Sequence, residues 1–187
     1  MKRYYLAYGS NLNVPQMKMR CPTSRLVGKA TIHGYCLLFR GSKTGSYLTI
    51  EPSKRGKVPV VVWEVTPSDE RALDRYEGFP RFYYKKDFEV TLDAPVGEKK
   101  VEAFAYIMHE DRPLGLPTDF YMEVCADGYE DFGFDKKYLY RAVQRSRKAI
   151  ARADARRLAK MAAETTTTAK TFTGKENENE YEYLPFV

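Results

Sequence analysis

The amino-acid sequence predicts a mixed α+β fold: a small, mostly antiparallel, barrel-like sheet with flanking helices, plus a basic C-terminal helix and tail. Roughly six strand-like segments precede two helical ones, with one short helix inserted midway. This order differs from the regular strand–helix alternation that builds parallel sheets. The 187 residues are 43% hydrophobic and 14% aromatic, so the chain can bury a core and is not wholly disordered.

Six segments alternate in hydrophobicity or are continuously apolar, as strands are. They cover residues 4–8, 26–40, 47–51, 58–65, 82–92 and 101–108. Gly28 and Gly34 indicate bulges or points of close approach in the long second segment. We expect a turn at residues 54–57 to join the third and fourth segments, and the fourth is apolar enough to be covered on both faces. The last two segments are expected to pair as a hairpin around residues 95–97.

Four segments have helical features. Residues 14–20 fit one or two turns, and longer helices are expected over 67–77, 118–129 and 136–163. The helix over 67–77 carries its own boundary signals, with Thr66 as N-cap, Pro67 at the first position and Gly78 just past the end. We therefore divide the chain into a domain over 1–135, a basic helix over 136–164 and a low-complexity tail over 165–187, whose apolar end could dock.

The net charge of +6 is unevenly distributed. Residues 1–135 hold 19 basic and 19 acidic residues, so the whole excess lies after them. Between residues 136 and 160 there are ten basic residues against the single Asp154. A neutral domain with a basic appendage is not the even basic stripe of a dedicated nucleic-acid binder. The helix is either a solvated face with an apolar seam or a surface for an anionic partner.

Other features of the sequence indicate where the protein is located and whether it holds a metal. No apolar run approaches the roughly 18 residues that span a bilayer, and the N-terminus is not a signal peptide. Cys21, Cys36 and Cys125 are widely spaced, which favours a reducing, cytoplasmic setting. His33 and His109 have no second ligand at suitable spacing, so we expect no metal. The oligomeric state stays open, a dimer included.

The segment Tyr8–Leu12 is the first chemical feature. A strand followed by a glycine turn leaves backbone N–H groups unpaired, and such groups can hold an anion or a developing oxyanion. Ser10 and Asn11 add short donors at the same place. The alternative is an ordinary Asx or Ser turn that caps the next element.

Glu77, the last residue of the helix predicted over 67–77, is the second feature. Leu73, Tyr76 and Glu77 share one helix face, so core packing of the first two would carry Glu77 inward. Burial and the helix C-terminus should both raise the pKa of this carboxyl, which marks it as a functional candidate. The alternative is that Glu77 lies at the edge of the fold and forms an ion pair with Arg75 or Arg81. Glu70 and Asp74 lie on other faces and are expected to be solvated.

Together, these features resemble the γ-glutamylcyclotransferase-like family. The resemblance rests on Tyr8-Gly9-Ser10-Asn11-Leu12, then Val62-Trp63-Glu64-Val65, then Leu73-Asp74-Arg75-Tyr76-Glu77-Gly78, and it covers about residues 3–135. It implies a small mixed barrel with flanking helices and a cleft in which a glutamate faces the loop. It also implies an enzyme, a lyase or acyltransferase, that releases 5-oxoproline from a small γ-glutamyl compound without metal or cofactor.

The resemblance assigns roles to individual residues. Glu77 matches the catalytic acid/base, and the loop residues Tyr8, Gly9, Ser10, Asn11 and Leu12 match the substrate-binding segment. Tyr84, Tyr106 and Tyr121 match positions around the pocket, with one gap needed to align Tyr121. The chain after residue 135 has no counterpart in the family pattern.

The expected function is intramolecular attack of the glutamyl α-amine on the γ-amide, with Glu77 as general acid/base. A Glu with a raised pKa suits this role, because general-base catalysis is most efficient when the pKa is near the working pH. Two alternatives remain: a non-catalytic module that uses the basic helix to bind a partner, and a cyclotransferase acting on a γ-glutamyl group on a carrier protein. The group beyond the amide stays unidentified, although Arg81 or Arg112 could meet a second carboxylate.

Overall fold

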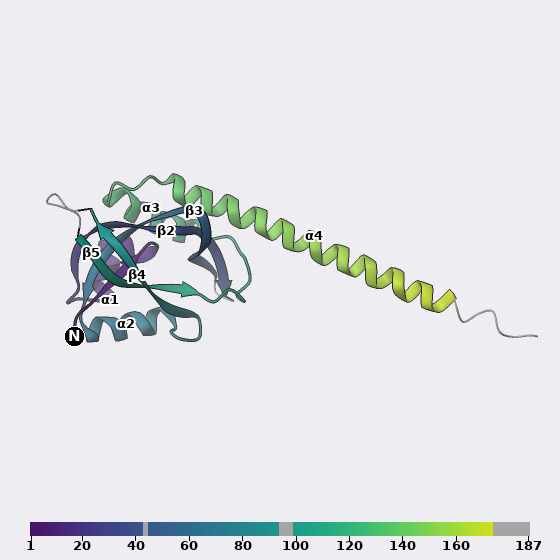
Figure 1. Cartoon of the computed structure of the whole chain (residues 1–187), viewed down its shortest axis with the longest axis horizontal. Coiled ribbons are helices and arrows are strands. Elements are labelled where there is room, and N and C mark those ends of the chain that lie inside the picture. The colour runs from purple at the N-terminus through teal and green to yellow at the C-terminus, as the bar shows by residue number, and fades with distance from the viewer. Residues whose placement is uncertain (43–44, 94–98, 174–187) are drawn as a thin grey trace, which may run out of the picture. The chain divides into compact units, whose positions relative to one another are not determined.

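The structure is a computed structural model that describes the backbone of residues 1–42, 45–93 and 99–173. The chain divides into two compact units, Met1–Lys148 and Ala149–Val187. The elements in chain order are β1 (Arg3–Ala7), the 3-10 helix η1 (Ser10–Leu12), α1 (Val14–Arg20), β2 (Arg25–Ser42), β3 (Gly45–Val65), α2 (Pro67–Glu77), β4 (Tyr83–Leu92), β5 (Lys99–Met108), α3 (Asp119–Asp131) and α4 (Lys137–Thr173) (Figure 1).

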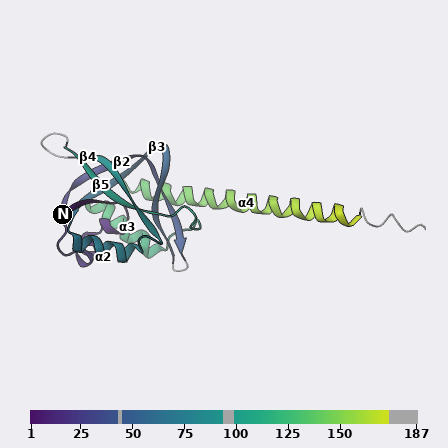
Figure 2. The same ribbon diagram turned by 60° about the horizontal axis from the view of Figure 1, so that its bottom comes forward.

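One five-stranded sheet, in the order β2-β3-β1-β5-β4, forms the centre of the first unit. Neighbouring strands are antiparallel except β1 and β5, which run parallel. The sheet curves strongly (Figure 2). It is not a closed barrel, but its two edge strands meet at a single bridge between Lys29 and Asp93. The mixed α+β class predicted from the sequence is therefore confirmed. The turn predicted at 95–97 lies outside the described residues.

The prediction of separate strands over 47–51 and 58–65 is wrong, because β3 is one strand that pairs with β2 along its length. The segment 54–57 does not reverse the chain. Tyr35 pairs with Pro52 and His33 with Lys57, so four residues of β3 bulge opposite Gly34, whose φ is +77°. The expected irregularities of β2 are both present, since the register also shifts between Leu26 and Gly28.

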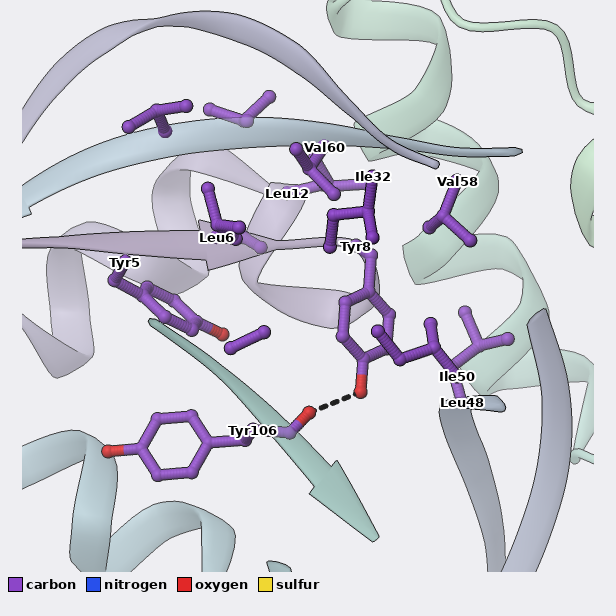
Figure 3. Packing of buried hydrophobic residues seen from close by; sticks show 14 of the residues in the cluster. Tyr5, Leu6, Tyr8, Leu12, Ile32, Leu48, Ile50, Val58, Val60 and Tyr106 are labelled. Atoms are coloured by element: carbon purple, nitrogen blue, oxygen red, sulfur yellow. Dashed lines mark hydrogen bonds between the residues drawn. The ribbon is translucent and has the colours of Figure 1, made fainter. Parts of the chain in front are cut away.

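The core lies inside the curve of the sheet. Its largest fully buried side chains come from β1, β2, β3, β5 and α3, and include Trp63, Tyr106, Tyr129, Phe39 and Phe104. Figure 3 shows the ring of Tyr8 among buried apolar side chains such as Ile32, Leu48 and Ile50, with its hydroxyl directed at the backbone carbonyl of Tyr106. The end of β1 is thereby fixed to β5 by a buried hydrogen bond, and this sets where the following loop begins.

Two helices cover the loop after β1. Helix α2 is capped as predicted: Thr66 and Asp69 form a capping box, and Gly78 ends the helix with a φ of +65°. Helix α3, with Thr118 as N-cap, passes so close to η1 that a Cβ at Gly128 would lie 2.6 Å from the Cβ of Leu12. The loop is consequently packed from behind by the backbone of α3.

Helix α4 extends ten residues beyond the predicted end at residue 163. In the first unit its Leu139, Ala142 and Ser146 are buried, and the Ser146 hydroxyl accepts a hydrogen bond from the Phe39 backbone N–H at 2.8 Å. In the second unit, residues 151–165 are exposed. Across the described residues, none of the helices combines the length and apolar character that crossing a membrane requires.

We expect Gly128→Ala to destabilise the protein. Alanine is the better helix former by about 1 kcal/mol, but its Cβ would overlap Leu12 and force a backbone shift, which costs roughly 1–3 kcal/mol. The melting temperature of Gly128→Ala, compared with that of the wild type, measures the net effect of these two terms on stability. Gly28→Ala is the matched control, because a Cβ there meets nothing closer than 3.8 Å. A higher melting temperature for Gly128→Ala would contradict the close packing of α3 on η1.

Candidate functional site

A narrow pocket opens where the loop after β1 faces the C-terminal end of α2. It is lined by Tyr5, Tyr8, Gly9, Ser10, Asn11, Leu48, Glu77, Tyr83, Tyr106 and Tyr121. Seven of the nine site residues predicted from the sequence are among them, although they come from four separate segments of the chain. The enclosed volume is about 30 Å³. Without side-chain movement, it therefore accepts only a water-sized part of a ligand.

Glu77 reaches this pocket because of how α2 is anchored. Leu73, one turn earlier on the same face, is fully buried in the core. Gly78 ends the helix immediately after Glu77, so the half-buried carboxyl lies at the helix C-terminus and faces the loop. Tyr76 does not help to carry it inward, contrary to expectation: this side chain is 48% exposed, and its hydroxyl lies 3.3 Å from the Ser10 hydroxyl.

The side-chain amide of Asn11 connects the loop to the carboxyl. Its Nδ2 donates to Glu77 Oε1 at 3.0 Å and to the Tyr5 hydroxyl at 2.9 Å. Its Oδ1 accepts a hydrogen bond from Arg20 Nη1 at 2.6 Å. Arginine can only donate, and therefore the orientation of the amide is fixed, with its NH₂ group toward Glu77.

Arg20 is the charged neighbour of Glu77 and Asn11 that sequence reasoning missed. It ends α1, donates to Gln16 Oε1 at 2.7 Å, and places its guanidinium 3.8 Å from the centre of the Tyr76 ring. The signal available in the sequence was a basic residue in the last turn of the helix that directly follows the loop. That signal is weak, because cations are common at helix C-termini for reasons of the helix dipole alone.

The pKa of Glu77 is raised to about 7, and desolvation by the surrounding protein is the largest cause. The positive charge of Arg20 and the hydrogen bond from Asn11 act in the opposite direction. Among the described residues, Glu77 forms no ion pair with Arg75 or Arg81, the partners that the alternative interpretation required. At neutral pH the carboxyl can therefore both accept and donate a proton.

Tyrosine side chains form most of the remaining wall. The Tyr83 hydroxyl donates to the Leu48 carbonyl at 3.1 Å, and the Tyr121 hydroxyl accepts from the Leu48 N–H at 3.2 Å. Burial is the main reason that the pKa values of Tyr5, Tyr8, Tyr83 and Tyr121 are raised. These hydroxyls consequently stay neutral and serve as hydrogen-bonding groups.

Tyr106 links the pocket to a charged cluster behind it. Its hydroxyl donates to Asp74 Oδ1 at 2.6 Å, and the same oxygen lies 2.7 Å from Lys85 Nζ. Lys85 also contacts Glu70 at 2.6 Å, and Glu70 contacts Arg3 at 2.9 Å. The expectation that Asp74 and Glu70 are simply solvated is wrong, because both carboxylates fix the back of the pocket.

Two residues predicted for the pocket do not line it. Tyr84 is directed to the other face of β4, where its hydroxyl donates to Glu110 at 2.9 Å, because side chains alternate along a strand and Tyr83 takes the inward position. Leu12 is fully buried and packs against α3 rather than against the pocket. Tyr83 and Tyr5 replace them in the lining.

The pocket has no set of side chains suited to a metal. Within residues 1–42, 45–93 and 99–173, no three His, Cys, Asp or Glu side chains are grouped closely enough to hold one. Glu77 is the carboxylate of the pocket lining, and its neighbours are hydroxyl, amide and backbone groups.

Comparisons with known proteins agree on one family. The family model described as "Gamma-glutamyl cyclotransferase, AIG2-like" matches residues 5–123, a span that contains both the loop and Glu77. The chain is 30% identical to gamma-glutamylcyclotransferase of Bos taurus over 143 residues, with 72% of this chain and 73% of that protein covered, and the Homo sapiens protein gives the same values. A solved gamma-glutamyl cyclotransferase has the same fold, with a TM-score of 0.67 at 24% identity, covering 76% of this chain and 86% of that one.

We expect Glu77→Gln to stabilise the folded state above neutral pH. The pKa of Glu77 is about 7 in the folded protein against 4.5 in the unfolded chain, so the folded state holds the proton more tightly. Stability is therefore lost as the pH rises from about 4.5 to 7, on the order of 3 kcal/mol in total. Glutamine stays neutral and avoids this loss.

Thermal unfolding between pH 4.5 and 8 measures the difference. Each kcal/mol shifts the melting temperature by about 2–4 °C in a chain of this size. The advantage of Glu77→Gln should therefore reach several degrees at pH 8 and shrink toward zero near pH 4.5. Glu123→Gln, at an exposed position of α3, is the control. An advantage that is equal at both ends of the pH range would contradict the raised pKa.

Proposed function

The chain belongs to the gamma-glutamyl cyclotransferase, AIG2-like family of enzymes, and from this premise we propose that it releases 5-oxoproline from a small γ-glutamyl compound, with Glu77 as general acid/base. The observation that carries the proposal is the half-buried Glu77, whose pKa is raised to about 7 and which faces Asn11 of the loop.

The first step is removal of a proton from the substrate α-amine. That amine must be neutral before its nitrogen can attack the γ-carbonyl carbon of the same molecule. An unperturbed glutamate is a weak base for an ammonium group, whereas a carboxylate with a pKa near 7 is better matched. Glu77 accepts the proton, the new C–N bond closes a five-membered ring, and the γ-carbonyl oxygen takes up negative charge.

The second step breaks the original amide bond. Glu77, now protonated, donates its proton to the leaving nitrogen as the tetrahedral carbon collapses, which yields 5-oxoproline and a free amine or amino acid. The ring nitrogen still carries one proton more than the lactam product, and the regenerated carboxylate of Glu77 transfers this second proton to the released amine, which departs as an ammonium group. Glu77 ends the turnover as a carboxylate, and the protons balance. Because attack is intramolecular, holding the glutamyl chain in a bent conformation supplies much of the rate.

The loop over residues 8–12 is assigned to substrate binding. Because η1 begins at Ser10, the N–H groups of Ser10 and Asn11 have no acceptor within the helix. They are suited to either the substrate carboxylate or the γ-oxyanion. Side chains of the lining must move to admit the reacting end, because the volume is about that of one water molecule. The group beyond the amide then extends toward the exposed Tyr76 and Phe79, which lie beside Ser10 and Tyr106 of the lining.

Glu77→Gln should lower kcat for γ-glutamyl dipeptides by about 10²–10⁴, the usual contribution of general acid–base catalysis. Release of 5-oxoproline, followed by chromatography, is the measurement. In the wild type, kcat/KM should rise with pH to a plateau with a midpoint near 7, because Glu77 must start deprotonated. If the Glu77→Gln variant released 5-oxoproline as fast as the wild type, Glu77 would not be the general acid/base.

Arg20→Gln tests the residue that sequence reasoning missed. Loss of the guanidinium removes an interaction that lowers the pKa of Glu77, so the midpoint of kcat/KM against pH should move upward. Activity should then fall more at pH 6 than at pH 8. Arg75→Gln removes a cation from the last turn of α2 and should leave the midpoint in place. Equal shifts in the two variants would show that Arg20 acts only through net charge.

A further inference from the structure

We propose a second binding site, for a small phosphate-bearing molecule, in a cleft between β2, the bulge of β3 and the start of α4. The cleft has a volume of about 200 Å³ and is lined by Cys36, Leu37, Arg55, Gly56, Lys57, Tyr138, Arg141 and Arg145. It lies within the first unit and shares no residue with the Glu77 pocket. Occupancy of the cleft does not depend on the reaction proposed for Glu77.

The bulge of β3 forms one wall. Residues 53–56 loop out opposite Gly34, and the backbone of Gly56 presses against β2 so closely that a Cβ there would lie 2.1 Å from the Tyr35 carbonyl oxygen. Only glycine fits this contact. The flanking Arg55 and Lys57 are both exposed and belong to the cleft. The bulge thus presents two cations from a tightly held piece of backbone.

Helix α4 forms the opposite wall. Arg141 and Arg145 are four residues apart and therefore lie on one face of the helix. The turn is held in place by buried Ala142 and by the hydrogen bond from the Phe39 N–H to Ser146. Arg145 Nη1 donates to the Leu37 carbonyl, which anchors that guanidinium and leaves its other N–H groups to face a ligand.

The cleft has four positive side chains and no carboxylate. Among the residues that the structure describes, Arg55, Lys57, Arg141 and Arg145 form no ion pair, whereas Arg3, Arg40 and Lys85 elsewhere in the unit are all paired. Asp135, near the start of α4, is paired with Lys137, and its charge also acts on Arg141. Residues 1–135 carry no net charge, whereas Arg141 and Arg145 belong to the basic helix. The cluster therefore forms where the two cations of the bulge meet this helix.

Phosphate is the anion that fits these donors. A guanidinium presents a planar fork of N–H groups that binds phosphate oxygens in pairs, and several such forks match a group with three oxygens and up to two negative charges. A cleft lined by charges of one sign attracts an ion of the opposite sign. The volume admits a phosphate or pyrophosphate group with a small attached body, and not a large folded polymer.

Calorimetric titration with pyrophosphate, at an ionic strength held constant with NaCl, tests the proposal. We expect saturable binding at one site. The double variant Lys57→Glu/Arg141→Glu should raise the Kd by about tenfold or more, which corresponds to a loss of about 1.4 kcal/mol of binding free energy. The matched control is Lys54→Glu/Arg147→Glu, at exposed positions of the same strand and helix that do not line the cleft. It changes the net charge equally and should bind within about twofold of wild type.

Equal losses in the two double variants would overturn the site, because they would show diffuse attraction. Absence of saturable binding in the wild type would overturn it as well. Melting temperatures without ligand verify that both variants fold. Pelleting with phosphatidylcholine vesicles, with and without a phosphoinositide, separates the sources of phosphate: dependence on the phosphoinositide and on Lys57 and Arg141 assigns a lipid headgroup, and binding of pyrophosphate alone assigns a soluble ligand.

Discussion

The arrangement of the Glu77 pocket depends on one side chain, the amide of Asn11. It contacts a base of the proposed reaction, a buried tyrosine and an arginine at once, and these belong to α2, β1 and α1. A buried polar group that is fully satisfied fixes the positions of its partners, because any displacement leaves a donor or acceptor unpaired. The loop, the helix end and the guanidinium are consequently held in one geometry before a ligand arrives.

The position of the Glu77 carboxyl at the end of α2 could be predicted from the local sequence. Thr66, Pro67 and Gly78 set the limits of α2 so firmly that Glu77 had to be its last residue, and Leu73 determined which face turns inward. The raised pKa follows from this placement. Tyr76 was predicted wrongly because a tyrosine at a helix end can leave the core while its ring stacks on a cation. Arg20 could not be found, since its proximity to Glu77 is created by the fold and not by spacing in the chain.

The errors in the sheet and in the tyrosines have a common origin. Alternation with a period of two identifies a strand, but it does not tell which set of side chains points inward. The sequence alone therefore could not distinguish Tyr83 from Tyr84 as the pocket residue, and the pairing of β4 with β5 decides between them. In the same way, a charged run with a glycine at 54–57 predicts a turn, whereas β2 is long enough to pair with both halves of β3 and makes the run a bulge. Both outcomes depend on pairing between strands that are distant in the chain, and this pairing cannot be predicted from the local sequence.

The close approach of Gly128 to Leu12 bears on how the protein recognises its ligand. A loop that is packed against a helix backbone loses its conformational freedom when the chain folds, and no further ordering is required at the moment of association. Recognition then resembles a rigid template more than an adaptable surface. In the proposed reaction, this fixed loop backbone would discriminate by shape at the reacting end of the substrate.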